Sequence, residues 1–124
     1  MEIALLGGTG DIGEGLALRW ARHSCHDITI GSRDPEKARE TATGYEETLN
    51  AHGVPSGVVG LENAEAAARA DVVVCCVPAY HLSDTIASVA NALDTGDILV
   101  SPAVGMKHDG DGAHYNRPAD GSVL

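Results

Sequence analysis

The 124-residue sequence contains no phenylalanine, and aromatic residues make up only 3% of it. A hydrophobic core must therefore be built mainly from Ala, Val, Ile and Leu, within a hydrophobic content of 44%. No apolar run approaches the roughly 20 residues that cross a membrane, and no basic stretch precedes the apolar N-terminal run as in a signal peptide. We therefore expect one globular domain in the cytoplasm, without a membrane partner.

Positive charge is also scarce, because 18 acidic residues oppose 8 basic ones and leave a net charge of −10. This balance argues against nucleic acid or an anionic membrane surface as a partner. Carboxylates keep a protein soluble in a cytoplasm of high salt, so a halophilic source is one hypothesis. The other is an ordinary acidic protein.

The three cysteines, Cys25, Cys75 and Cys76, do not suggest a disulfide framework, because their number is odd. None of them has a partner at the spacing of a metal site, so Cys75 and Cys76 are expected to be small core residues. Residues 109–114 hint at a metal loop but lack the length and acidic spacing of a calcium site. The sequence therefore predicts no metal.

The N-terminal segment carries the most informative pattern of the chain. An apolar run over residues 3–6 leads directly into Gly8-x-Gly10-x-x-Gly13. A helical pattern follows, with one apolar face expected from Ile12, Leu16, Ala17, Trp20 and Ala21. A strand, a glycine turn and a helix in this order are typical of a dinucleotide-binding unit, although an ordinary glycine-rich turn is the alternative.

Each glycine of this motif has an expected role. Gly8 would allow the tight turn, Gly10 would leave room for a pyrophosphate, and Gly13 would let the helix pack close to the strand. The free N–H groups and the dipole of the helix start would then face the phosphates.

The rest of the chain alternates between strand and helix patterns. We expect further strands at residues 27–30, 58–59, 71–77 and 97–100, with the apolar run 71–77 buried on both faces. We expect a helix over residues 38–49, with Asp34 as N-cap, Pro35 as first residue and apolar spacing marked by Ala38, Ala42, Tyr45 and Leu49. We expect two further helices over residues 63–70 (capped by Asn63) and 82–93 (stopped by Gly96). This order predicts an α/β fold: a Rossmann-type doubly wound parallel sheet with helices on both faces.

The end of the second expected strand indicates which dinucleotide is bound. NAD-selective domains place Asp or Glu there, but this chain has Ser32 and Arg33, with Lys37 one helical turn later. Ser32 can donate a hydrogen bond to a 2′-phosphate, and the two cations can neutralise it. The sequence therefore predicts NADP rather than NAD. The alternative is that Arg33 and Lys37 pair with neighbouring acidic residues on a solvated helix face.

The loops after the fourth and fifth expected strands should line the nicotinamide half of the cofactor. They contain Val77 and Pro78 in one case and Val104 in the other. No acid–base pair stands out, because no Tyr-x-x-x-Lys occurs and a lone loop residue such as His81 is more often a polar surface residue. We therefore predict no catalytic side chain.

Four stretches together resemble one family: LLGGTGDIGEGLALRWA, ITIGSRDPEKA, ADVVVCCVPAY and LVSPAVG. The family is that of the NADPH-dependent reductases of coenzyme F-420 (F420), also called 8-hydroxy-5-deazaflavin:NADP oxidoreductases. The similarity covers about residues 1–105. The cytosolic domain of the six-transmembrane metalloreductases looks similar too.

The resemblance implies an NADP domain followed by a smaller C-terminal segment, and hydride transfer between the nicotinamide and the deazaflavin. It implies that the pyrophosphate region is met by Thr9, Gly10, Asp11 and Ile12. Ser32, Arg33 and Lys37 would hold the 2′-phosphate, and Val77, Pro78 and Val104 would approach the nicotinamide. Hydride transfer between two stacked rings needs positioning rather than a proton donor, which fits the missing acid–base pair.

The expected organisation is an NADP-binding Rossmann domain over residues 1–105. Residues 106–124 are expected to form a loop-like tail that leads into a C-terminal segment absent from this chain. The expected partners are small-molecule cofactors, with the oligomeric state open and a homodimer as the candidate. Two other functions stay open: an NADP-dependent imine or 2-hydroxyacid reductase, and a non-catalytic dinucleotide-sensing module.

Overall fold

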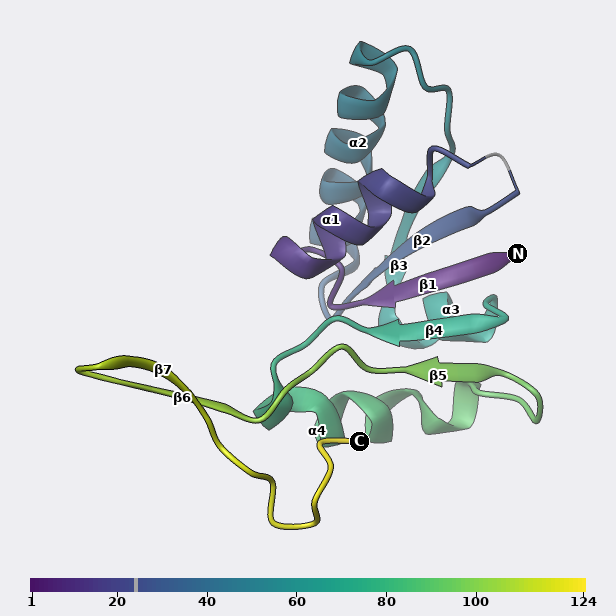
Figure 1. Cartoon of the computed structure of the whole chain (residues 1–124). Coiled ribbons are helices and arrows are strands. Elements are labelled where there is room, and N and C mark those ends of the chain that lie inside the picture. The colour runs from purple at the N-terminus through teal and green to yellow at the C-terminus, as the bar shows by residue number, and fades with distance from the viewer. Residues whose placement is uncertain (24) are drawn as a thin grey trace.

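The computed structural model describes residues 1–23 and 25–124, and its main part is a five-stranded parallel sheet flanked by helices (Figure 1). The strands of the sheet are β1 (Glu2–Leu6), β2 (Asp27–Ser32), β3 (Val58–Glu62), β4 (Val72–Cys75) and β5 (Ile98–Val100). The helices are α1 (Asp11–Trp20), α2 (Pro35–Ala51), α3 (Asn63–Ala68) and α4 (Ala79–Val89), the last followed by a 3₁₀ turn, η1 (Ala90–Ala92). The strand order is β3-β2-β1-β4-β5, which confirms the Rossmann-type prediction.

Helices cover both faces of the sheet, and each face has its own core. Alternate side chains of β1 serve the two sides: Ile3 and Leu5 pack in the core under α1 and α2, whereas Ala4 and Leu6 pack in the core under α3 and α4. The central strands are therefore buried on both faces. This explains the unbroken apolar run of β4, which the sequence analysis predicted.

The strand register brings three chain turns to one edge of the sheet. Leu6 lies opposite Gly31 of β2 and Cys75 of β4, so β1, β2 and β4 all reach this edge. The order of the strands reverses between β1 and β4, and in such sheets ligands bind at the carboxyl ends beside that point.

The start of α2 is formed as predicted. The Asp34 side chain accepts hydrogen bonds from the backbone N–H groups of Glu36 (3.0 Å) and Lys37 (3.3 Å), and Pro35 is the first helical residue. The helix buries the four predicted residues, Ala38, Ala42, Tyr45 and Leu49. The local signals of cap and apolar spacing therefore suffice for this element.

Several predicted details were wrong. Asn63 does not cap α3, because the preceding Glu62 carboxylate accepts the N–H of Ala64 at 2.8 Å. The fourth strand, β4, ends at Cys75 rather than at residue 77, and Pro78 is the N-cap of α4. Gly96 lies beyond η1 rather than at the end of the helix. Ile12 is 51% exposed, because the first turn of α1 lies at the sheet edge, where no further layer covers it.

The predicted loop-like tail contains a β-hairpin, which corrects that expectation. Strands β6 (Met106–Asp109) and β7 (Gly112–Tyr115) pair antiparallel around Gly110 and Asp111, with Gly112 at a φ of +117°. The Asp109 side chain stabilises the turn, because it accepts the Asp111 N–H at 2.9 Å and lies 3.0 Å from Nε2 of His114. All residues of both strands are exposed, and the hairpin projects from the domain (Figure 1). The domain boundary at residue 105 stays a prediction.

None of the described helices is both long and apolar enough to cross a membrane.

Candidate functional site

The chain turns sharply after β1, at the carboxyl edge of the sheet. Gly7 has a φ of +66°, in the left-handed region, so the tight turn lies at Gly7 and not at the predicted Gly8. Gly8 is instead enclosed between strands. Its N–H donates to the carbonyls of Leu5 (3.0 Å) and Gly31 (3.2 Å), and a Cβ there would lie 2.6 Å from the Leu5 carbonyl oxygen. Gly7 is therefore required by its backbone conformation, and Gly8 by the lack of space for a side chain.

The other two motif glycines contrast with each other. A Cβ on Gly13 would overlap the backbone of Gly8, so α1 lies directly against the turn, as expected from the motif. A Cβ on Gly10 would have a single neighbour within 4 Å, the Gly7 carbonyl oxygen at 3.9 Å. The space in front of Gly10 is therefore open, as a pyrophosphate would require.

The start of α1 offers unused hydrogen-bond donors. Gly10 is the N-cap without a side-chain cap, and the first helical bond runs from the Glu14 N–H to the Gly10 carbonyl at 2.9 Å. The N–H groups of Asp11, Ile12 and Gly13 consequently have no partner within the helix. They present the positive end of the helix dipole to an anion, while the exposed carboxylates of Asp11 and Glu14 compete for the same end.

The predicted 2′-phosphate residues lie beside this turn, where β2 ends. The buried Ser32 accepts the Asp34 N–H at 3.2 Å through its hydroxyl oxygen, which leaves the hydroxyl hydrogen free to donate. The side chains of Arg33 and Lys37 are exposed. Among the described residues, the ion pair found joins His114 and Asp109 in the tail hairpin, so neither cation is in an ion pair. The alternative, in which both cations are paired with neighbouring acids, is therefore not the arrangement of this structure.

A residue that the sequence analysis placed only in the core belongs to this site. The Tyr45 hydroxyl of α2 donates a hydrogen bond to the Gly8 carbonyl at 3.0 Å, and the side chain is 8% exposed. Burial, followed by the nearby carboxylate of Glu14, raises the pKa of Tyr45 to about 12. The predicted buried face of α2 includes Tyr45, but no local signal links it to a glycine 37 residues away.

The expected nicotinamide residues are only partly brought together. Val77 contacts the glycine turn, because a Cβ on Gly7 would lie 2.6 Å from its Cγ1, and the Cys76 N–H donates to the Leu6 carbonyl at 2.8 Å. Pro78 follows at the start of α4, whereas Val104 is 61% exposed on the segment after β5.

Titratable side chains near this edge do not form an acid–base pair in the described residues. Tyr80 is 79% exposed, and its ring lies 4.5 Å from that of the neighbouring His81 at a tilt of 54°, with His81 also exposed. Burial raises the pKa of Cys76 to about 12 and also raises that of Cys75, so both thiols stay protonated as core residues. Their predicted role in the core is confirmed.

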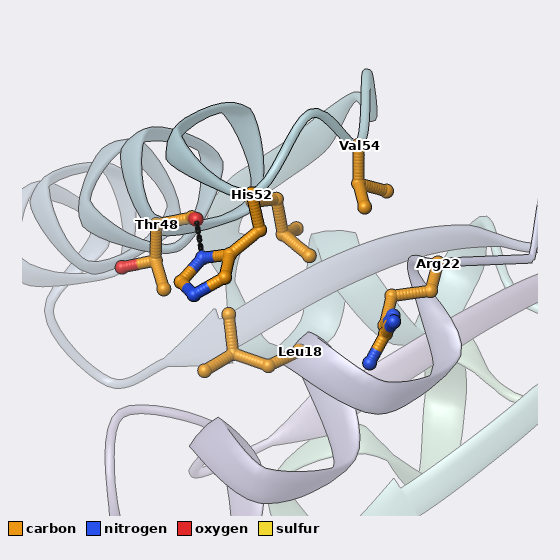
Figure 2. A pocket seen from close by; sticks show the side chains of 6 residues that line it. Leu18, Arg22, Thr48, His52 and Val54 are labelled. Atoms are coloured by element: carbon orange, nitrogen blue, oxygen red, sulfur yellow. Dashed lines mark hydrogen bonds between the residues drawn. The ribbon is translucent and has the colours of Figure 1, made fainter.

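A hollow of about 200 Å³ lies between α1 and α2, far from the glycine turn. Figure 2 shows that Leu18 and Arg22 line it from the end of α1, and Thr48 and His52 from the end of α2. Nδ1 of His52 lies 2.8 Å from the Thr48 carbonyl, so the imidazole ring is hydrogen-bonded to the last turn of α2. Both helices begin at the glycine-turn edge, and the hollow is therefore at the opposite end of the molecule from the candidate site.

Comparison with known sequences identifies the family of this fold and site. Residues 2–105 match the family described as NADP oxidoreductase, coenzyme F420-dependent. The chain is 45% identical over 104 residues to the F420-dependent NADP reductase of Methanocaldococcus jannaschii, a match that covers 84% of this chain and 45% of that protein. It is 42% identical over 104 residues to the enzyme of that name from Methanothermobacter marburgensis, with the same two shares, 84% and 45%.

Solved structures agree with the sequence match. A protein of Arthrobacter sp. FB24, assigned as an F420-dependent NADP reductase, has a TM-score of 0.74 at 30% identity and covers 99% of this chain and 54% of its own. The malate dehydrogenase of Cryptosporidium parvum has a TM-score of 0.67 at 17% identity, covers 84% of this chain and 38% of its own, and shares the fold alone.

The chain spans about half the length of the relatives that it matches, 45% of the two archaeal enzymes and 54% of the Arthrobacter structure. The matched residues 2–105 include the glycine turn, the end of β2 and the start of α2. This chain belongs to the family of NADP oxidoreductases that depend on coenzyme F420.

Proposed function

We propose that this chain binds NADP(H) at the glycine turn and the end of β2, and that the protein transfers a hydride between NADP(H) and coenzyme F420. The observation that carries the proposal is the Ser32 hydroxyl with the uncommitted side chains of Arg33 and Lys37, placed next to the turn. The Gly8–Gly31 hydrogen bond of 3.2 Å links the two parts. The relatives named above are F420-dependent NADP reductases.

The charges at this corner favour NADP over NAD. The chain has a net charge of −10, yet two of its 8 basic residues, Arg33 and Lys37, flank this corner. The Asp34 carboxylate is directed to the helix start by its hydrogen bonds to the N–H groups of Glu36 and Lys37. The Glu62 carboxylate, from the residue that pairs with Ser32 across the strands, accepts the N–H of Ala64 at the start of α3. A 2′-phosphate would therefore meet a hydroxyl donor and two cations rather than a repelling carboxylate.

The contribution of this chain to the reaction is binding and orientation. NADP(H) supplies or accepts the hydride, and the deazaflavin is the other reactant. The helix start and Gly10 would hold the pyrophosphate, while Val77, Pro78 and Val104 would shield the nicotinamide from water. We propose no acid, base or nucleophile from this chain, and we assign the deazaflavin to no residue of it.

Three further predictions, on partners, location and assembly, accompany this function. The partners are small-molecule cofactors, the location is the cytoplasm, and the candidate assembly is a homodimer. The first follows from the family, whereas the other two rest on the sequence analysis alone.

Calorimetric titration of this chain with NADPH and NADH tests the binding half of the proposal. We expect NADPH to bind at least about tenfold more tightly, because a charge-assisted hydrogen bond contributes about 1.5–3 kcal/mol. The catalytic half is tested by NADPH oxidation with oxidised F420, an imine or a 2-keto acid as acceptor, for this chain and for a full-length relative. Turnover with the imine or keto acid alone would contradict the F420 reaction, and NADPH binding without turnover in either protein would favour a sensor.

A further inference from the structure

We propose that Tyr45 is a positioning residue for the dinucleotide: its hydroxyl fixes the peptide between Gly8 and Thr9 so that the Thr9 N–H is held ready for the pyrophosphate. This inference rests on the proposed NADP(H) binding and adds a residue that the glycine motif does not contain. It assigns to α2 a role in shaping the phosphate-binding turn.

The hydrogen bond joins segments that are distant in sequence. The Tyr45 hydroxyl donates to the Gly8 carbonyl at 3.0 Å across 37 residues, from a side chain that is 8% exposed. The same helix begins at the Asp34 cap and carries Lys37 in its first turn. Tyr45 therefore ties the glycine turn to the helix that carries Lys37, one of the three residues proposed to hold the 2′-phosphate.

The hydrogen bond to the Gly8 carbonyl also sets the direction of the Thr9 N–H, because both groups belong to one planar peptide. In a planar trans peptide the carbonyl of one residue and the N–H of the next point to opposite sides. The Gly8 carbonyl faces inward, because it accepts from Tyr45 and would also be overlapped by a Cβ on Gly13. The Thr9 N–H must then point away from this packed side.

The Thr9 N–H is available for a ligand. No hydrogen-bond acceptor for it is found among the residues that the structure describes, whereas the neighbouring N–H groups of Gly8 and Gly10 donate to backbone carbonyls. Since Gly10 leaves open space beside it, the Thr9 N–H joins the unused donors at the start of α1 as part of one anion-binding turn.

The geometry needs a permanent donor on α2, and Tyr45 is one. Its pKa, raised to about 12 by burial and by Glu14, keeps the hydroxyl protonated at any working pH. Without the hydroxyl, the Gly8 carbonyl would lose its partner inside the protein, and the peptide would be free to rotate toward another donor.

The test compares Tyr45→Phe with Leu49→Val in titrations with NADPH and with adenosine 2′-monophosphate. The second ligand carries the 2′-phosphate but no pyrophosphate. Leu49 lies one turn further along α2 in the same core, so its variant controls for lost stability. We expect Tyr45→Phe to weaken NADPH about fivefold, as for one hydrogen bond, and to change the monophosphate less than twofold. Leu49→Val should leave both affinities within twofold.

A second measurement does not depend on how the variant folds. In the unchanged chain, the amide NMR signal of Thr9 should shift strongly on addition of NADPH and stay in place with the monophosphate. An unshifted Thr9 amide, unchanged NADPH affinity in Tyr45→Phe, or equal losses for both ligands would overturn the role of Tyr45. If the unchanged chain does not bind NADPH, the proposed function itself fails, which is a separate and earlier outcome.

Discussion

The two halves of the sheet differ in how closely they are packed. Around β1 and β2, α1 and α2 pack closely against the sheet. The N–H of Gly8 is held by hydrogen bonds to backbone carbonyls, and the first N–H groups of α1 have no partner within the helix. Beyond β4 the structure opens: β5 is an edge strand with exposed Ile98 and Val100, and the hairpin of β6 and β7 is exposed throughout (Figure 1). The half of the sheet that holds the proposed phosphate site is therefore closely packed, whereas the half that holds the proposed nicotinamide residues is more exposed.

The largest effect is expected where the first half is most tightly packed. Gly13→Ala should destabilise the fold by about 3 kcal/mol, because the new Cβ would overlap the Gly8 backbone and force α1 away from the turn. Urea unfolding followed by circular dichroism measures the loss. As a matched control, Gly15→Ala adds a Cβ with nothing within 4 Å and should be neutral or slightly stabilising. Equal stability of both variants would contradict the close packing.

Gly10→Val separates binding from folding in the same turn. Because the space before Gly10 is open, the free energy of unfolding should fall by less than about 1 kcal/mol. A valine side chain would occupy the place of the pyrophosphate, so NADPH affinity should drop by about a hundredfold or more, equivalent to about 2.7 kcal/mol. Calorimetry on the folded variant measures this loss, and normal binding would remove Gly10 from the proposed site.

Arg33→Ala probes the corner at the end of β2. The variant should weaken NADPH about tenfold or more, since it removes a charge-assisted contact, and leave NADH nearly unchanged. Arg39→Ala is the control, because Arg39 is an exposed cation on α2 that is not assigned to the site. Equal losses for both dinucleotides would contradict the NADP assignment.

The smallest effect is expected in the open half. Val104→Ser should change the free energy of unfolding by less than about 0.5 kcal/mol, because the side chain is 61% exposed. NADPH affinity should change less than about threefold, since a single apolar contact at an exposed position is worth little. Thermal unfolding and calorimetry check both. A large loss of stability would mean that this segment is packed more tightly than the structure describes.

Features whose signals are local were predicted best from the sequence. The Asp34 cap, the proline that follows it and the apolar spacing of α2 act within a few residues, and the structure reproduces them. The predicted turn at Gly8 and the predicted burial of Ile12 were wrong, because both depend on contacts that are not local. Which glycine takes the positive φ, and which side of α1 is covered, depend on how the turn sits against β2 and on where the sheet ends.

The candidate site divides in the same way. The candidate residues at the glycine turn and at Ser32, Arg33 and Lys37 could be proposed from the sequence, because the motif and the strand end fix their spacing along the chain. Tyr45 could not, since its bond to Gly8 exists only when α2 packs over the turn. The tail hairpin was missed because its turn signal, Asp109 to Gly112, stands without an apolar alternation on either side.

From the sequence alone, one could predict the order of strands and helices up to β5, the place of the glycine motif and the lack of an acidic residue at the end of β2. These features arise from backbone and side-chain preferences over a few neighbouring residues. The tertiary structure was needed to show that Gly8 is enclosed, that Gly10 faces open space, and that a tyrosine from α2 donates a hydrogen bond to the turn. These features depend on contacts that the parallel register of β1 and β2 makes possible, and such contacts join residues that are far apart in the sequence.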